Sequence, residues 1–185
     1  WGMFSFADQV ESVTSINLGG GLGVPFVARD RPLDLRVWVE TVRNCLGSRP
    51  LKVYIEPGGY IVRDSGLMVL QVNMVERKKD VDFIGVDGGM NLDMEPVFYN
   101  LTRFPVPCRL TGTDSSASSG ASGKKRCFTI AGNINEAIDI WAENFQLPDD
   151  IREGDYLAFL NAGGYGVASS SNHCMRGSLS EFLLL

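Results

Sequence analysis

The stretch Val53–Tyr60 places one carboxylate, Glu56, directly after an apolar run and directly before a proline and two glycines. In α/β folds, ligands bind where strands run into glycine turns, because backbone amides and one fixed side chain converge there. Glu56 is therefore the leading candidate for a site residue. A strand that ends in a turn with a solvated glutamate fits the same pattern, so Glu56 needs partners elsewhere in the chain.

A second glycine run, Gly19–Gly23 with a leucine in fourth place, follows a short apolar strand predicted over Ser15–Leu18. Glycine lets backbone amides approach a phosphate closely, which makes this loop a candidate phosphate cradle. Taken alone, the signal is weak. The run does not match the dinucleotide-binding fingerprint, and it lacks the lysine of a P-loop.

Two acidic residues, Glu136 and Asp139, lie in a stretch that is predicted to form a helix over Asn135–Asn144. At a spacing of three residues the two carboxylates would share one face of that helix and serve one site. Acids near a helix N-terminus are also stabilised by the helix dipole, so a purely structural role fits the same pattern.

Tyr165 stands among three glycines after an apolar strand, in a turn that would leave its hydroxyl free to donate to an anion. An ordinary turn is the alternative. His173 is the only histidine, and the four cysteines have no ligand spacing. We therefore expect neither a metal site nor a catalytic triad.

Three elements are predicted to position Glu56 and the first glycine run. They are the strand at Ser15–Leu18, a helix over Pro32–Leu46 with an apolar stripe, and a strand at Leu51–Ile55. A strand, helix and strand of this length form a βαβ unit, whose two strands are parallel. Both glycine turns then lie at the carboxyl ends of the strands, on one face.

Beyond Tyr60 the helical periodicity almost disappears and short β-patterned runs replace it. This change predicts two domains, residues 1–62 and 63–185, the second a β-barrel or sandwich. A serine- and glycine-rich segment, 113–125, is expected to be a mobile loop. The predicted strands are 61–62, 66–75, 82–86, 108–111, 126–131 and 155–160.

Composition limits the classes of partner. The net charge of −5 argues against nucleic-acid binding, which needs clustered lysine and arginine. No apolar run approaches the ~20 residues that span a bilayer, so no membrane segment is expected. Unpaired cysteines fit a reducing compartment, and we expect a cytoplasmic protein.

Five motifs follow one another along the chain: Asn17–Phe26, Ile55–Val62, Val86–Asn91, Gly132–Asp139 and Gly163–Gly166. Taken together and in this order, they resemble the fold-type III pyridoxal phosphate decarboxylases, most closely the diaminopimelate decarboxylase branch. The resemblance implies an α/β plus β chain. It would hold the last βαβ part of an alanine-racemase-like (β/α)8 barrel, followed by a C-terminal β-barrel domain. It also implies pyridoxal 5'-phosphate, an amino-acid-like substrate and a homodimer with a shared active site.

The same resemblance assigns roles to individual residues. Glu56 would bond the pyridine nitrogen and keep it protonated, so that the ring accepts electrons. Glu136 and Asp139 would reach the distal end of the substrate across the dimer interface. The cofactor phosphate would be contacted by a set of glycine amides and one phenol, namely Gly19, Gly20, Gly21, Gly58, Gly59 and Tyr165.

Departures from the family pattern bear on activity. Gly59 stands where the family has an arginine, and Asn135 stands where it has a cysteine that serves as an acid. The family's Schiff-base lysine lies on an early barrel strand. Lys52 does not replace it, because it is roughly 13 Å from Glu56 along an extended strand. We expect the C-terminal portion of a decarboxylase without its catalytic lysine; the alternative is a non-catalytic dimerisation or binding module.

Overall fold

The computed structural model describes residues 2–26, 30–101, 103–108 and 123–184. These residues form two compact units, Trp1–Arg63 (unit 1) and Asp64–Leu185 (unit 2). The sequence places the domain boundary after residue 62. Most of the loop expected at 113–125, and the last three residues of the strand expected at 108–111, lie outside the described residues.

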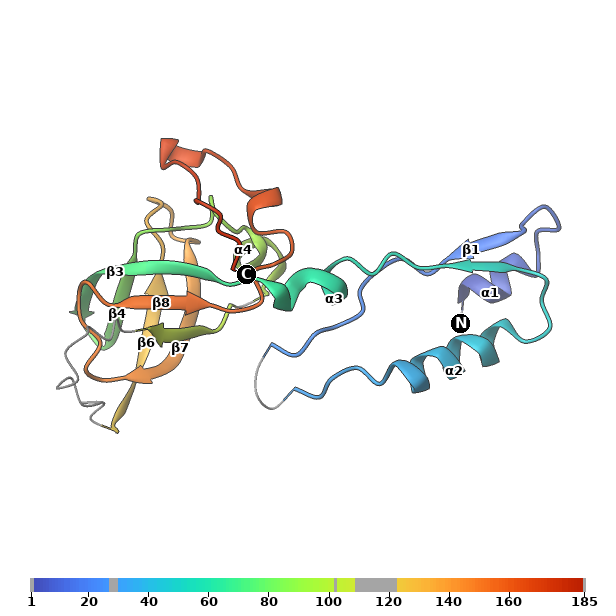
Figure 1. Cartoon of the computed structure of the whole chain (residues 1–185), viewed down its shortest axis with the longest axis horizontal. Helices are drawn as coiled ribbons and strands as arrows, with labels where there is room; N and C mark the ends of the chain where they lie inside the picture. The colour runs from blue at the N-terminus through green and yellow to red at the C-terminus, as the bar shows by residue number, and fades with distance from the viewer. Residues whose placement is uncertain (1, 27–29, 102, 109–122, 185) are drawn as a thin grey trace. The chain divides into compact units, whose positions relative to one another are not determined.

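Unit 1 contains two strands that pair in parallel, β1 (Ser15–Asn17) and β2 (Lys52–Tyr54). Helix α2 (Leu35–Leu46) connects them, and helix α1 (Gly2–Ala7) precedes them (Figure 1). The predicted order of strand, helix and parallel strand is confirmed. Its turns therefore follow the carboxyl ends of β1 and β2, as the candidate site requires.

Helix α2 begins later than Pro32 because Asp34 caps it. The Asp34 carboxylate accepts the backbone N–H of Arg36 at 2.9 Å, and Gly47 ends the helix with a left-handed φ of 59°. A small core of Phe4, Ala7 and Ile16 holds unit 1 together. No residue of α2 is fully buried.

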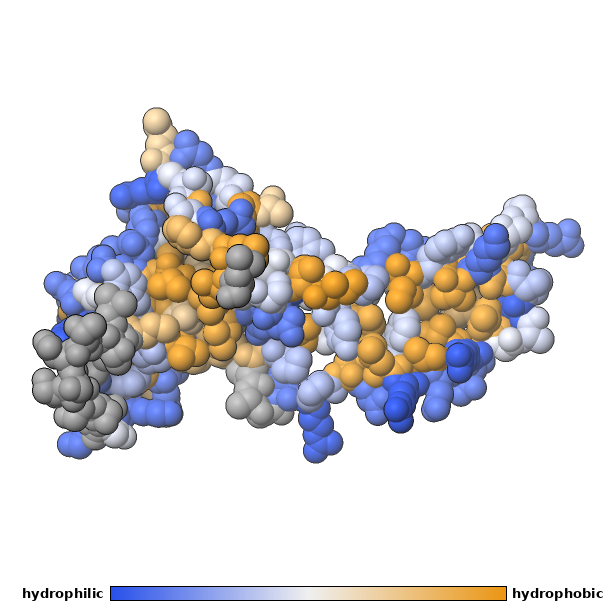
Figure 2. All heavy atoms as spheres, viewed as in Figure 1, coloured by the Kyte–Doolittle hydropathy of each residue, from blue (hydrophilic) through white to orange (hydrophobic). Residues whose placement is uncertain are grey.

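Unit 1 leaves large apolar side chains exposed, as the orange atoms in Figure 2 show. Phe6 is 63% exposed, Val37 59% and Tyr54 53%. These fractions are high for aromatic and β-branched residues beside a sheet. The core of unit 1 is thus small relative to its apolar content.

Unit 2 is built on one six-stranded, barrel-like sheet with the order β5-β8-β3-β4-β6-β7 (Figure 1). The neighbouring strands are antiparallel except for the parallel pair β4 and β6. Alternate residues face a core that includes Ile84, Ile130, Trp141 and Phe159. The strands are β3 (Met68–Lys78), β4 (Val81–Val86), β5 (Pro105–Cys108), β6 (Lys125–Ala131), β7 (Ile140–Pro148) and β8 (Tyr156–Phe159).

The remaining described helices of the two units are short, and none exceeds five residues. Among the described residues, no helix has the length and apolar content needed to cross a bilayer. These short helices are α3 (Gly59–Val62), η1 (Arg63–Ser65), α4 (Glu95–Tyr99), η2 (Val167–Ser169) and η3 (His173–Met175).

The helix predicted over Asn135–Asn144 is wrong. Turns precede Ile140, and strand β7 begins there and pairs with β6 along nearly its whole length. The helical spacing of the acidic and apolar residues does not decide the structure, because Trp141 becomes buried only when β7 joins the sheet. The strand predicted at 61–62 is also wrong, since both residues belong to α3.

A buried ion cluster fixes the connections around β5 and β8. The guanidinium of Arg103 is fully buried and bonds Asp93 at 2.7 Å, the carboxylate of Glu95, and the backbone oxygen of Asn161. It joins the start of α4 to the loop after β8. One buried cation therefore pairs with both carboxylates and offsets the cost of their burial.

Replacing Arg103 by methionine leaves Asp93 and Glu95 without their shared cation. We expect the free energy of unfolding to fall by about 3–5 kcal/mol, measured by urea denaturation. Arg152→Met is the matched control, because Arg152 is exposed and its nitrogen lies 3.9 Å from Asp155, a pair worth about 1 kcal/mol or less. Equal losses in the two variants would contradict the role of the cluster.

Candidate functional site

Glu56 lies just beyond the carboxyl end of β2, where Asn17 at the end of β1 holds it. The Asn17 amide nitrogen donates to Glu56 Oε1 at 2.5 Å, and the Asn17 amide oxygen accepts the N–H of Gly19 at 2.8 Å. The backbone N–H of Glu56 also donates to the Gly19 oxygen at 2.8 Å. One amide side chain thus orients the carboxylate and the glycine loop together.

The glycines of the first loop are required by its geometry. A β-carbon on Gly20 would lie 2.5 Å from the backbone oxygen of Glu56, a distance that real contacts do not show. Gly19 and Gly21 adopt left-handed φ angles of 72° and 78°. The structure therefore brings this loop and Glu56 together, and their contact with a cofactor stays a prediction.

The side chain of Arg63, which sequence reasoning missed, lies beside the second glycine turn. Gly58 caps helix α3, and a β-carbon on Gly59 would lie 3.0 Å from Arg63 Nε. The guanidinium is largely buried and lies 5.3 Å from the centre of the Phe26 ring, a cation–π contact. The sequence contains a clue to this contact. Arg63 follows Gly59 by four residues, a spacing that places both on the same face of a helix.

Asp139 in unit 2 is almost fully buried and joins two turns. Its carboxylate accepts the N–H of Met90 and the N–H of Ile134, each at 2.7 Å. Burial raises the pKa of Asp139 above its ordinary value, and the two N–H donors offset part of that effect. This arrangement is suited to positioning backbone segments.

Glu136 lies on the surface and does not share a face with Asp139. Its Oε1 is 2.5 Å from His173 Nε2, and both side chains are about two fifths exposed, at 39% and 41%. Because turns replace the predicted helix, the side chain of Asp139 is buried and that of Glu136 points to the surface. Glu136 is consequently free of the sheet core and available to a ligand or partner chain.

Tyr165 adopts a left-handed φ of 65° and is 53% exposed. Its backbone oxygen accepts the N–H of Ser169 at 3.0 Å, so the residue stands in a tight turn that leads into η2. The candidate phosphate contacts Gly19–Gly21 belong to unit 1, whereas Tyr165 belongs to unit 2. Their common role stays a prediction.

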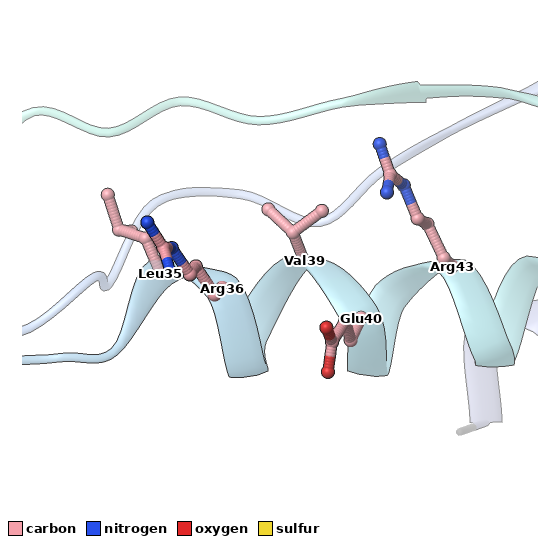
Figure 3. A pocket seen from close by; sticks show the side chains of 5 residues that line it. All are labelled: Leu35, Arg36, Val39, Glu40 and Arg43. Carbon is pink, nitrogen blue, oxygen red and sulfur yellow. The ribbon is translucent and has the colours of Figure 1, made fainter.

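A hollow in unit 1 runs along helix α2 and does not include the predicted site residues. Figure 3 shows Val39 and Arg43 projecting from one side of the helix, while Glu40 projects from another. Leu35 and Arg36 complete the lining. The hollow follows from the partial burial of the apolar side of α2, and it presents one carboxylate and two guanidinium groups around that apolar strip.

Comparison with known proteins gives a family match over most of the chain. Residues 26–163 match the family described as pyridoxal-dependent decarboxylase, C-terminal sheet domain. The diaminopimelate decarboxylase of Pseudomonas fluorescens is 34% identical over 169 residues, which cover 91% of this chain and 38% of the relative. The chain spans about two fifths of the length of the curated relatives it matches.

Solved structures agree with this match. A crystal structure from Aquifex aeolicus has a TM-score of 0.77 at 28% identity, covering 95% of this chain and 42% of that one. Diaminopimelate decarboxylase from Helicobacter pylori, complexed with L-lysine, has a TM-score of 0.76. At 24% identity, with 96% of this chain and 42% of that one covered, it supports the fold alone.

Gly20→Ala tests the close approach of the first loop to Glu56. We expect the free energy of unfolding of unit 1 to fall by about 1–3 kcal/mol, because the new methyl group forces the backbone apart. The indole N–H resonance of Trp38 reports this unit during urea titration. Gly23→Ala, in open space of the same loop, should leave stability unchanged or raise it by up to about 1 kcal/mol.

Asp139→Asn tests the buried carboxylate, since an amide NH2 then faces one backbone donor. We expect a loss of about 1–3 kcal/mol in the free energy of unfolding of unit 2, read from the indole N–H of Trp141. Glu143→Gln, exposed on β7, should change it by less than about 0.5 kcal/mol.

The pH dependence of the Asp139→Asn variant has a defined sign. The folded-state pKa of Asp139 is raised, so its contribution to stability is complete below about pH 3.8, its ordinary pKa, and falls as pH rises through the folded pKa. The stability difference between the wild type and Asp139→Asn should therefore widen on acidification. A difference that narrows would contradict the burial argument.

Proposed function

Because the chain belongs to the family of pyridoxal-dependent decarboxylases, whose C-terminal sheet domain it carries, we propose that it is the C-terminal portion of an amino-acid decarboxylase. The substrate is an amino acid or amino-acid-like compound, as the similarity to diaminopimelate decarboxylases supports. The observation that carries the proposal is the family match over residues 26–163, joined to the Asn17, Gly20 and Glu56 arrangement.

The structure of unit 1 supports its assignment as the last βαβ part of a (β/α)8 barrel. Its two strands are parallel and α2 lies between them in sequence. Its exposed apolar side chains, Phe6, Val37 and Tyr54 among them, fit a unit that packs against further barrel elements. The site then lies at the carboxyl ends of the strands, where such barrels carry their chemistry.

The residues at this end fit pyridoxal 5'-phosphate. The Gly19–Gly21 loop lies against the backbone of Glu56, where a β-carbon on Gly20 would clash, and Gly58 and Gly59 begin the second turn. Such backbone is suited to binding a phosphate through N–H groups. When bound, the cofactor supplies an electron sink for the carbanion that the loss of CO2 leaves.

The side chains of this portion would then have four tasks. Glu56, oriented by Asn17, holds a proton on the ring nitrogen of the cofactor. Tyr165 donates its hydroxyl to the phosphate. Glu136 recognises the distal end of the substrate across a homodimer interface, and Asp139 fixes the backbone on which Glu136 stands.

A non-catalytic dimerisation or binding module is the second candidate, and the position of Lys52 favours it. Lys52 is the only lysine among residues 1–63. It pairs with Ser15 at the amino end of the two strands, whereas Glu56 follows the carboxyl end. A lysine that captures the cofactor must therefore come from outside unit 1.

A chimera tests the two candidates. The amino-terminal three-fifths of the Pseudomonas fluorescens relative is fused before this chain, and CO2 release from amino acids is measured with pyridoxal phosphate. We expect activity, and Glu56→Gln should lower kcat by about 10²–10⁴-fold, because the ring nitrogen loses its proton partner. Glu11→Gln, an exposed glutamate of the same unit, should keep full activity.

The chain alone provides the negative control. Mixed with pyridoxal phosphate, it should show no visible absorption of a covalent lysine adduct and no lysine trapped by borohydride. A folded chimera that binds the cofactor but releases no CO2 would favour the non-catalytic module. A trapped lysine in the chain alone would overturn the assignment of the lysine to another segment.

A further inference from the structure

The fold brings together three metal-ligating side chains that are far apart in the sequence. Glu136, His173 and Cys174 each offer a donor atom, and these oxygen, nitrogen and sulfur atoms all lie within 4.8 Å of one another. No other group of three or more such residues meets this condition in the part of the chain that the structure describes. The sequence predicts no metal site, because the residues lack a linear ligand spacing.

We propose that Glu136, His173 and Cys174 bind a divalent transition-metal ion of the zinc type, with water completing its coordination. A thiolate, an imidazole and a carboxylate are the ligand types of Zn²⁺, and tetrahedral ligand atoms stand about 3.3–3.8 Å apart. The separations of the three donor atoms, all within 4.8 Å, are close to this spacing. The ion takes the place of the present Glu136 to His173 contact.

The backbone around Cys174 supports this role. Neighbouring residues in a regular helix or strand project in different directions, yet His173 and Cys174 converge on one carboxylate. Cys174 and Met175 both adopt left-handed φ angles, 53° and 56°. Such a conformation costs roughly 1–2 kcal/mol for a residue other than glycine, and it recurs where a side chain must be aimed.

Both segments that carry the ligands are tied to one turn of the sheet unit. Asn91 accepts the N–H of Ser171 at 2.7 Å through its backbone oxygen, and its side-chain nitrogen donates to the oxygen of Gly177 at 3.4 Å. Asn91 thus holds both ends of the loop that bears His173 and Cys174. Its neighbour Met90 donates to Asp139, which fixes the loop of Glu136.

Metal binding at this site has a defined proton balance. The Cys174 thiol releases its proton to the buffer as its sulfur bonds the ion, while His173 binds as a neutral imidazole and Glu136 as a carboxylate. No oxidation or reduction takes place. The proposal does not depend on the decarboxylase function, although a bound ion would withdraw Glu136 from any substrate.

Cobalt titration of the whole chain tests the site, because thiolate-bound Co²⁺ absorbs by charge transfer. In a phosphine reductant that does not bind the ion, we expect one equivalent of Co²⁺ to give this band and Zn²⁺ to bleach it. Cys174→Ser should abolish the band. Cys127→Ser is the matched control, since Cys127 is also exposed but lies outside the cluster, and it should keep the band unchanged.

Two further variants distinguish a three-ligand site from a reactive thiol. His173→Ala and Glu136→Gln should each weaken Co²⁺ binding more than tenfold, since even partners outside the coordination shell are worth 10–100-fold. The indole N–H of Trp141 confirms that each variant is folded. Absence of the band, its equal loss in Cys127→Ser, or an affinity within twofold of wild type in both variants would overturn the proposal.

Discussion

The carboxylate of Asp139 is the interaction on which the placement of the Glu136 loop in unit 2 depends. It accepts N–H groups from Met90 and Ile134, which belong to the turn after β4 and the loop before β7. Asn91, next to Met90, accepts the N–H of Ser171. Asp139 thus joins two segments that are distant in the sequence, and Asn91 ties a third segment to the same turn.

Burying a carboxylate is costly unless N–H groups satisfy it, and here glycines make that possible. A β-carbon on Gly89 or Gly132 would lie 2.4 or 2.2 Å from the Asp139 carboxylate. The same principle applies in unit 1, where Gly20 allows the loop to touch the backbone of Glu56. In both units the glycines leave the space in which hydrogen bonds, from Asn17 to Glu56 and from Met90 and Ile134 to Asp139, hold an acid in place.

Local sequence patterns predict local structure in this chain. They fail where the conformation of a segment depends on pairing with a strand that is distant in the sequence. The apolar stripe of α2 and the order of strand, helix and parallel strand follow from short-range spacing. Strand β7 does not, because Trp141 is buried by pairing with β6. Glu136 and His173 are 37 positions apart in the sequence, so their contact cannot be predicted from the spacing of a local motif.

The glycine at position 59 and the arginine at position 63 are best understood as one arrangement. A side chain at Gly59 would meet the Arg63 guanidinium at 3.0–3.3 Å, so the glycine is what lets that cation fold back along α3. Packing against Phe26 then keeps it buried. The resemblance to decarboxylases implies an arginine at position 59. Here position 59 is glycine, and the guanidinium beside it belongs to Arg63, one helical turn later in the chain.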